Sequence, residues 1–377
     1  MRALRNICLF VSALLCCHSA YAGNDGLGHA VGLNLRPSYI VPTHGFYNGW
    51  NPSGRKLQAA FNADVQYCLT LEGGTYQGIG LGVHSFFAND MMGTPVSLYL
   101  FQGAPLFALS EKLSAGYEWN LGLSSGWKNN GAVTASSLNV YINAAVLFTW
   151  RLNPHWALVF GPEYTHFSNG DTKFPNGGAN TVNLRLGTRY DLKPVDKTEI
   201  VNIFAGSGEK EDLSDRMTYD IIAMGGFRAD RSLSGGKLHV LNEAFPLAVL
   251  QFSPMYNFNR HLAAGLSADL LYDGSADISV SENENGDISW NSPGFLHQLS
   301  AGLSVRAELK MPIFAVNIGA GYNVSESEDL KGIYGIFALK GFVTDAFFLN
   351  LSYRLSSVNY AHNLTFGLGW RLGSVRK

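Results

Sequence analysis

The sequence predicts an all-β protein, an antiparallel transmembrane β-barrel of about 14–16 strands. Only 15% of the 377 residues are charged, which is well below the roughly 25% typical of a soluble domain. After residue 22, no stretch approaches the ~18 consecutive apolar residues of a membrane helix. The apolar residues instead recur at every second position over segments of about ten residues, which is typical of strands that present one face to lipid.

The composition also excludes two other classes of protein. A hydrophobic share of 46% with a formal net charge of −2 excludes an intrinsically disordered chain, which needs low hydrophobicity and high net charge. The same near-neutral balance lacks the basic excess of a nucleic-acid-binding protein. We therefore expect no nucleic-acid partner.

The N-terminus predicts an export signal over residues 1–22. Arg2 and Arg5 precede a short apolar run at 7–17, and an Ala-Tyr-Ala pattern ends at Ala22, after which cleavage is expected. Three of the four cysteines lie in this segment, so Cys68 would be alone in the mature chain. No intrachain disulfide is expected, although the compartment would allow one.

Alternation along the chain defines sixteen candidate strands. Between Leu138 and Trp150, for example, every second residue is apolar, whereas the interleaved positions include Asn139, Asn143 and Thr149. One face of each strand would meet acyl chains and the other would point into the lumen. The candidate strands are 29–42, 56–71, 78–87, 95–109, 113–125, 137–151, 156–168, 180–192, 217–229, 245–258, 262–273, 296–311, 314–323, 332–342, 346–356 and 363–372.

These strands must close into a barrel, because an open sheet edge is not stable in lipid. An even count puts both termini in the periplasm, with 152–155 as a tight inner turn and 169–179 and 274–294 as long outer loops. We predict one large barrel, with two smaller barrels as the alternative. Its parts would be a first half that carries the site, a linker or periplasmic loop, and a second half, at 23–192, 193–216 and 217–377.

Charged residues also occur at inward positions of the predicted strands. They could line a pore or form an ion-paired plug, and the sequence leaves both interpretations open. The residues are Arg185, Arg306, Glu308, Lys310 and Arg354.

Three polar residues fall on the lipid-facing positions of neighbouring strands. His166 and Ser168 share the outward face of 156–168, and Asn180 begins the next strand on the same face as Val182. Polar groups that face acyl chains are costly unless they have a use. The set suggests a Ser–His–Asn hydrolase, in which Ser168 attacks an ester carbonyl, His166 takes the proton and Asn180 holds the imidazole tautomer. The alternative is an interfacial His beside a strand-end Ser and a turn Asn.

The segment 165–180 resembles the active-site segment of a known family. His166-Phe167-Ser168-Asn169, followed by Pro175-Asn176 and by Asn180 fourteen residues after the His, is similar to the motif of the lipid A 3-O-deacylase (acyloxyacyl hydrolase-like) family of outer-membrane barrels. Looser similarity extends over 101–105, 116–120, 337–341 and 363–369.

This resemblance implies a serine esterase in the outer membrane of a Gram-negative bacterium that removes an ester-linked acyl chain from lipid A. Ser168 would be the nucleophile, His166 the base and Asn180 the orienting residue. Asn169, Asn176 or loop backbone amides would donate to the oxyanion. The expected partners are a membrane lipid, lipopolysaccharide or phospholipid, and the barrel-assembly machinery, while the oligomeric state is left open.

One departure from the family pattern leaves two other functions open. The family's deacylases have Glu where this chain has Asn180, whereas outer-membrane phospholipase A has a similar His-x-Ser-Asn-Gly with Asn at the same spacing. The alternatives are therefore phospholipase A activity on glycerophospholipids and a non-enzymatic barrel, either a pore or a pseudoenzyme. No cofactor is expected, and no His pair has metal-ligand spacing. The acidic residues Glu282, Glu284 and Asp287 of an outer loop could hold calcium, although a solvated acidic loop is the plainer interpretation. Separately, similarity to phospholipase A allows a calcium ion near the site.

Overall fold

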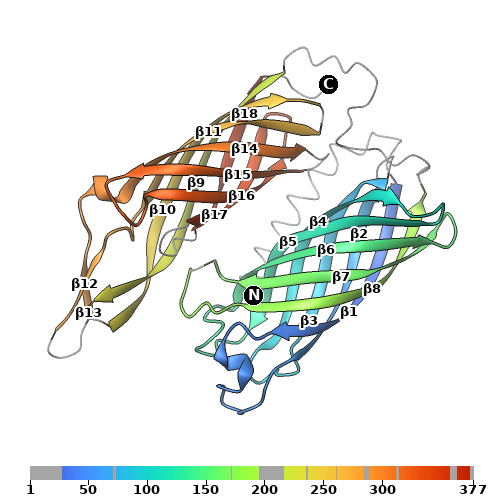
Figure 1. Ribbon diagram of the computed structural model, residues 1–377, viewed down its shortest axis with the longest axis horizontal. Helices are drawn as coiled ribbons and strands as arrows, with labels where there is room; N and C mark the ends of the chain where they lie inside the picture. The colour runs from blue at the N-terminus through green and yellow to red at the C-terminus, as the bar shows by residue number, and fades with distance from the viewer. Residues whose placement is uncertain are drawn as a thin grey trace. The chain divides into compact units, whose positions relative to one another are not determined.

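The protein folds into two closed antiparallel β-barrels of eight strands each (Figure 1). The structure, a computed structural model, describes residues 28–70, 74–170, 172–194, 216–234, 237–259, 261–283, 288–310, 314–356 and 363–373. The predicted signal peptide at 1–22 lies outside these residues, as does nearly all of the predicted linker at 193–216. The prediction of one larger barrel is wrong, and the two smaller barrels left as the alternative are found.

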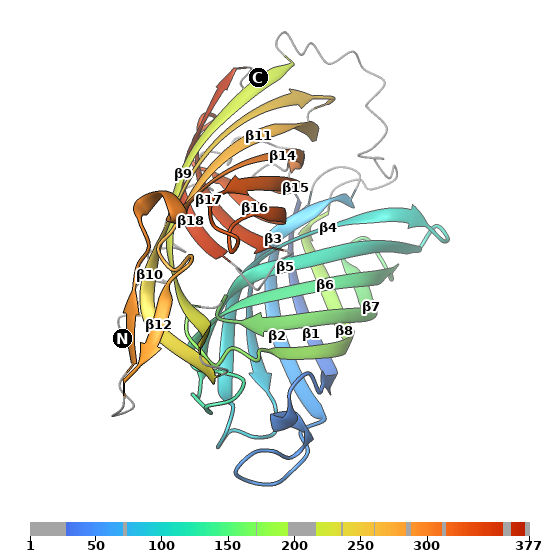
Figure 2. The same ribbon diagram turned by 60° about the vertical axis from the view of Figure 1, so that its left-hand side comes forward.

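Barrel 1 is formed by β1–β8, in which each strand pairs with the next along the chain. Its last strand, β8, returns to pair with its first, β1 (Figure 2). In this pairing, Val41 of β1 lies opposite Asn180 of β8. A short 3-10 helix, η1 (Gly45–Asn48), lies in the connection from β1 to β2. The strands are β1 (Gly28–Val41), β2 (Ala59–Thr70), β3 (Tyr76–Ser85), β4 (Gly93–Ala108), β5 (Leu113–Trp127), β6 (Leu138–Arg151), β7 (Trp156–Ser168) and β8 (Ala179–Lys193).

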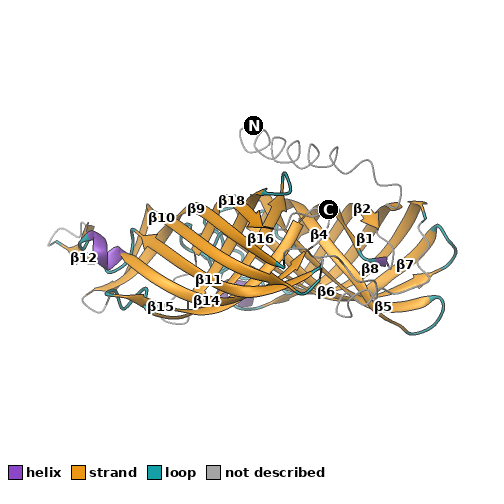
Figure 3. Cartoon of the chain, turned by 90° about the horizontal axis from the view of Figure 1, so that it is seen from above, coloured by secondary structure: helices purple, strands orange, loops and turns teal. Residues whose placement is uncertain are grey.

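Barrel 2 is formed by β9–β11 and β14–β18 and is closed by the pairing of β18 with β9. The 274–298 connection, where a long outer loop was predicted, also holds the hairpin β12 (Ser279–Glu282) and β13 (Ile288–Asn291) and the 3-10 helix η3 (Phe295–Gln298). Strands make up most of the described chain (Figure 3). The barrel strands are β9 (Met217–Ser234), β10 (Lys237–Asn257), β11 (Leu262–Asp273), β14 (Leu299–Lys310), β15 (Phe314–Ser325), β16 (Gly332–Phe342), β17 (Phe347–Ser356) and β18 (Asn363–Gly373).

The closing pairs explain why the single barrel was wrong. Alternation shows that a segment is a membrane strand, but it is the same in a small barrel and in a large one. The number of strands in a barrel depends on which strand pairs with the free edge of the first strand. Here β8 pairs with the free edge of β1, and β18 pairs with the free edge of β9. Each barrel is consequently a compact unit of its own.

The barrel wall follows the predicted alternation. On β7, Trp156, Leu158 and Tyr164 are exposed on the outside, whereas Ala157 and Glu163 are buried in the lumen. In the part of the chain that the structure describes, no helix is long and apolar enough to cross a membrane.

Buried ion pairs fill the lumen of barrel 1. Arg36 Nε lies 2.6 Å from Glu163 Oε2, and Arg185 Nη2 lies 2.7 Å from Glu118 Oε1. Arg36 also pairs with Asp64, and Arg185 with Glu163. Charges placed in so narrow a lumen require partners, because an unpaired buried charge costs several kcal/mol.

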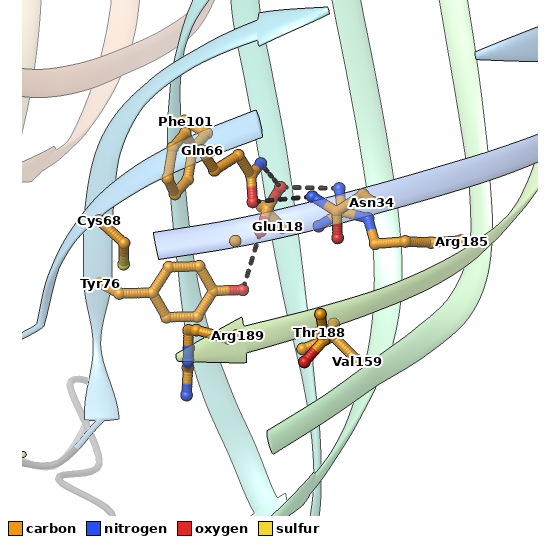
Figure 4. Close-up of a pocket in the computed structure, with 11 residues that line it drawn as sticks. Asn34, Gln66, Cys68, Tyr76, Phe101, Glu118, Val159, Arg185, Thr188 and Arg189 are labelled. Atoms are coloured by element: carbon orange, nitrogen blue, oxygen red, sulfur yellow. Dashed lines mark hydrogen bonds and ion pairs between the residues drawn. The ribbon is translucent and has the colours of Figure 1, made fainter. Parts of the chain in front are cut away.

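A small cavity remains among these polar side chains (Figure 4). Its volume of about 20 Å³ is enough for a single water molecule. Glu118, Arg185, Arg189, Tyr76 and Gln66 are among the residues that line it. The cavity is therefore a gap in a polar filling and is far too small for a lipid acyl chain.

The lumen of barrel 2 is filled in the same way. Lys340 and Arg371 each contact both Asp220 and Glu308, with Lys340 Nζ and Arg371 Nε each 2.7 Å from an Asp220 oxygen. Arg306 pairs with Asp269 at 2.9 Å.

All five lumen residues considered in the sequence analysis are inward and buried. Arg185, Arg306 and Glu308 are held in ion pairs. Lys310 donates a hydrogen bond to Asn257, and Arg354 lies over the ring of Tyr334. Three of the five are thus held in ion pairs, as the ion-paired interpretation predicts.

The two ends of barrel 1 differ in the length of their connections. At the end where β7 meets β8, the connections are long, at 42–58, 86–92, 128–137 and 169–178, whereas the opposite end has 71–75, 109–112 and 152–155. Bacterial outer-membrane barrels have long extracellular loops and short periplasmic turns. By this rule, we expect the end of β7 that carries His166 and Ser168 to be the extracellular end.

We expect Glu308→Gln to destabilise barrel 2, because it removes one of the two carboxylates that balance Lys340 and Arg371 in the lumen. Breaking such a buried arrangement costs about 3–5 kcal/mol. Urea unfolding of the refolded protein in detergent micelles, followed by tryptophan fluorescence, would show a lower midpoint. Glu328→Gln is the control, since Glu328 forms an exposed pair with Lys331 and its midpoint should not move. Equal midpoints for the two variants would contradict the ion-paired plug.

Candidate active site

Two of the three predicted catalytic residues, His166 and Asn180, are hydrogen-bonded on the outer wall of barrel 1, and Ser168 lies on the same strand face as His166. His166 and Ser168 are half-buried on the outward face of β7, whereas Phe167 between them is buried in the lumen. The strand register places Asn180 of β8 directly opposite His166. Period-two geometry and this register put the three residues at neighbouring positions of the wall. Their catalytic roles stay a prediction.

A hydrogen bond joins the imidazole to the amide. His166 Nδ1 lies 2.7 Å from Asn180 Oδ1. An amide oxygen can only accept, so in this arrangement Nδ1 carries the proton. The other ring nitrogen, Nε2, is then left with its lone pair and can act as a base.

Two further residues, neither of them predicted from the sequence, hold the Asn180 amide. The Tyr164 hydroxyl donates to Asn180 Oδ1 at 2.7 Å, and Asn180 Nδ2 donates to the Thr43 hydroxyl at 3.3 Å. Asn180 is only 7% exposed, and both ends of its amide are hydrogen-bonded. Tyr164 could have been found by its outward position two residues before His166. Thr43 lies in the β1–β2 connection, and no sequence signal points to it.

Gly178 borders both His166 and Ser168. Its φ is +66°, and a Cβ at this position would lie 3.4 Å from His166 Cε1 and 4.0 Å from Ser168 Cβ. The buried hydroxyl of Tyr47, on η1, donates to the Gly178 carbonyl at 2.7 Å. Burial raises the pKa of Tyr47, so this hydroxyl keeps its proton. The Ser168 hydroxyl itself makes no hydrogen bond to a described residue.

The predicted oxyanion donors, Asn169 and Asn176, contact each other in the loop after β7. The Asn169 backbone N–H donates to Asn176 Oδ1 at 3.1 Å, and Asn169 Nδ2 donates to the Lys173 carbonyl at 2.6 Å. The Asn169 side chain is buried and therefore shapes this loop. The oxyanion role of these residues stays a prediction.

A second Ser–His–Asn arrangement lies inside the lumen. His84 Nδ1 is 2.9 Å from Asn62 Oδ1, and His84 Nε2 is 2.7 Å from Ser97 Oγ. All three residues are at most 3% exposed, and the His84 ring packs against Tyr141 and Phe167. No substrate can reach this set through the wall, so we interpret it as part of the packed lumen.

Calcium binding would need several oxygen ligands gathered at one place. The described residues contain no group of three or more His, Cys, Asp or Glu side chains that could hold a metal ion. Of the predicted ligands, Glu282 lies on β12, whereas Glu284 and Asp287 lie outside the described residues. Calcium stays a prediction.

Each of the two barrels matches a known protein family. Residues 70–189 match the family described as lipid A 3-O-deacylase (PagL), and residues 217–374 match the acyloxyacyl hydrolase, C-terminal domain. The two matches together cover most of the chain. The chain belongs to the lipid A 3-O-deacylase family. This family and the β-barrel fold give the protein a lipid A deacylase-like role and an outer-membrane location.

Solved structures of outer-membrane barrels are similar to this chain at low sequence identity. Neisserial surface protein A is 10% identical, with 44% of this chain and 99% of that chain covered and a TM-score of 0.30. The Pseudomonas putida toluene transporter TodX is 12% identical, with 93% and 89% covered and a TM-score of 0.18. The β domain of the Bordetella autotransporter BrkA is 9% identical, with 92% and 99% covered and a TM-score of 0.21. A comparison with curated proteins finds no match.

We expect Gly178→Ala to slow the reaction of Ser168 with a fluorophosphonate probe by about tenfold or more, because small displacements of reacting groups cost up to about 10²-fold. The added Cβ would lie 2.9 Å from the Phe167 carbonyl oxygen, so the backbone between His166 and Ser168 would have to shift. Gly131→Ala is the matched control, since Gly131 has φ of +65° with nothing within 4 Å of its Cβ position. The rate of covalent labelling measures the effect, and equal rates for the two variants would contradict this arrangement of the site.

Proposed function

We propose that this protein is a serine esterase that removes an ester-linked acyl chain from lipid A at the outer face of the membrane. The observation that carries the proposal is the hydrogen bond between His166 Nδ1 and Asn180 Oδ1, on the lipid-facing wall beside Ser168. Membership of the lipid A 3-O-deacylase family supports the choice of substrate.

In the first half of the reaction, Ser168 Oγ attacks the ester carbonyl and His166 Nε2 takes the hydroxyl proton. The tetrahedral intermediate collapses, the bond to the sugar oxygen breaks, and His166 returns the proton to that leaving oxygen. Ser168 then carries the acyl group. In the second half, His166 takes a proton from water, the resulting hydroxide attacks the acyl-enzyme, and the fatty acid leaves as Ser168 regains its proton.

Oxyanion stabilisation is assigned to the loop after β7. The Asn169 backbone N–H directly follows the nucleophile, the position that supplies one donor in other serine hydrolases. In the structure this N–H is bonded to Asn176 Oδ1. Substrate would displace the amide oxygen, so that the Asn169 N–H and a reoriented Asn176 amide can donate to the charge that develops on the ester oxygen.

The position on the wall suits a lipid substrate. The patch is at the extracellular end, near the boundary between acyl chains and headgroups, where the acyl esters of an outer-leaflet lipid lie. A substrate that diffuses in the plane of the membrane reaches an outward-facing nucleophile without entering the barrel. The filled lumens of both barrels also weigh against a pore.

Asn180 favours one second candidate, phospholipase A activity. Outer-membrane phospholipase A resembles this chain in having Asn at this place, where lipid A deacylases have Glu. A glycerophospholipid presents the same ester chemistry at the same depth. Acyl release from purified lipid A and from phospholipid micelles, each with and without calcium, distinguishes the two substrates.

We expect Ser168→Ala and His166→Ala each to lower acyl release by about 10³-fold or more, because each removes a member of a cooperating set. The barrel should still assemble, since both side chains are on the outer wall. Ser97→Ala is the control, because it truncates the serine of the lumen set and should leave acyl release unchanged.

Mass spectrometry of lipid A from cells that carry each variant measures the outcome. Identical acylation of lipid A in cells with and without the wild-type protein would overturn lipid A as the substrate. Loss of activity in Ser97→Ala but not in Ser168→Ala would move the reaction to the lumen set.

A further inference from the structure

An amide in the orienting position poses a chemical problem for this site. A carboxylate offers two acceptor oxygens, so either one can receive the Nδ1–H of a histidine. An amide offers one acceptor and one donor group, and the two exchange places when the side chain turns over. In serine proteases, replacement of the orienting Asp by Asn lowers kcat about 10⁴-fold because the imidazole takes the wrong tautomer.

The two orientations of Asn180 have opposite consequences for His166. With Oδ1 toward the ring, as in the structure, Nδ1 holds the proton and Nε2 is basic. With Nδ2 toward the ring, Nδ1 would have to accept, and the proton would move to Nε2. Nε2 could then no longer take a proton from Ser168. Catalysis by this set therefore depends on a contact that selects the first orientation.

Tyr164 is placed to make that selection. Its hydroxyl donates to the same Oδ1 that receives the histidine proton, at 2.7 Å. A phenol is a better donor than acceptor, because the oxygen lone pair is conjugated with the ring, so it favours an oxygen over an NH₂ group. Thr43, on the other side, accepts from Nδ2 at 3.3 Å and fits the same orientation.

The surroundings strengthen this selection. Tyr164 lies on the lipid-facing side of β7 and Asn180 is buried. Little water competes for the amide there, and a hydrogen bond in a low-dielectric environment is stronger than one in water. The Tyr164 hydroxyl is also uncharged, so it orients the amide without placing a second ionised group beside the imidazole.

We propose that Tyr164 is a positioning residue that fixes the orientation of the Asn180 amide and, through it, the tautomer of His166. The inference rests on the proposed function, but it concerns a different contact. A distinctive consequence follows. Tyr164 is required because residue 180 is an amide, and with a carboxylate at 180 there would be no orientation to select.

A double-mutant cycle with Tyr164→Phe and Asn180→Asp tests this dependence. With Asn180 present, Tyr164→Phe should lower kcat for acyl release about tenfold, the size of one lost hydrogen bond, with KM nearly unchanged because the ring stays. In the Asn180→Asp background, the same change should alter kcat by less than about twofold, because a carboxylate has no wrong orientation. A loss that is equal in both backgrounds, or absent from both, would overturn the inference.

Tyr39→Phe is the matched control. Tyr39 on β1 and Tyr164 on β7 both lie opposite Val182 in the strand register, so both outward tyrosines are at the same height on the wall. Among the described hydrogen bonds, none involves the Tyr39 hydroxyl. Tyr39→Phe should therefore leave kcat unchanged in either background, and a tenfold loss there would show that any outward hydroxyl at this height matters.

A second measurement does not depend on activity. Nitrogen-15 NMR of the histidine rings in detergent micelles, with His166 assigned by comparison with His166→Gln, reports which ring nitrogen is protonated. Tyr164→Phe should increase the share of the Nε2–H tautomer, whereas Tyr39→Phe should not. An unchanged tautomer would overturn the inference even if kcat falls. Wild-type protein that is no more active than Ser168→Ala would instead refute the proposed function, and the NMR result would still stand.

Discussion

Every backbone N–H and C=O inside a bilayer needs a hydrogen-bond partner, and this requirement governs the structure. It forces β1 to pair with β8 and β9 with β18, so that each run of eight strands closes on itself. Eight strands leave an interior just wide enough for side chains. The inward residues of each barrel are therefore pressed together, and their charges form the buried networks around Glu163 and Glu308.

A filled lumen restricts where chemistry on a lipid can take place. The cavity described in barrel 1 has room for about one water molecule and none for an acyl chain. The groups that react must lie on the outer wall or in the loops, at the depth of the ester. His166, Ser168 and Asn180 meet this condition because the two-residue period of β7 and the register of β8 turn them outward at the extracellular end.

The sequence predicted what depends on local periodicity and missed what depends on long-range pairing. It located the barrel strands and the outward position of the three site residues, because residue parity alone decides these. It could not give the size of each barrel, because alternation is the same whichever strand closes the edge. Thr43 was missed because its contact with Asn180 depends on the path of the 42–58 loop. Tyr164 has the right parity, but whether its hydroxyl reaches Asn180 depends on its rotamer.

The two Ser–His–Asn sets of barrel 1 show that hydrogen-bond geometry is not sufficient for function. In the lumen set, His84 is bonded on both sides, to Asn62 and to Ser97, and the whole set is sealed behind the wall. In the outer set, the His166–Asn180 bond is formed, while the Ser168 hydroxyl makes no hydrogen bond to a described residue and lies half-buried at the lipid surface. A closed hydrogen-bond chain stabilises the packing of the lumen, whereas a nucleophile needs its oxygen available to the substrate. The strand parity that separates the two sets is thus the basis for proposing chemistry at the outer set and packing at the lumen set.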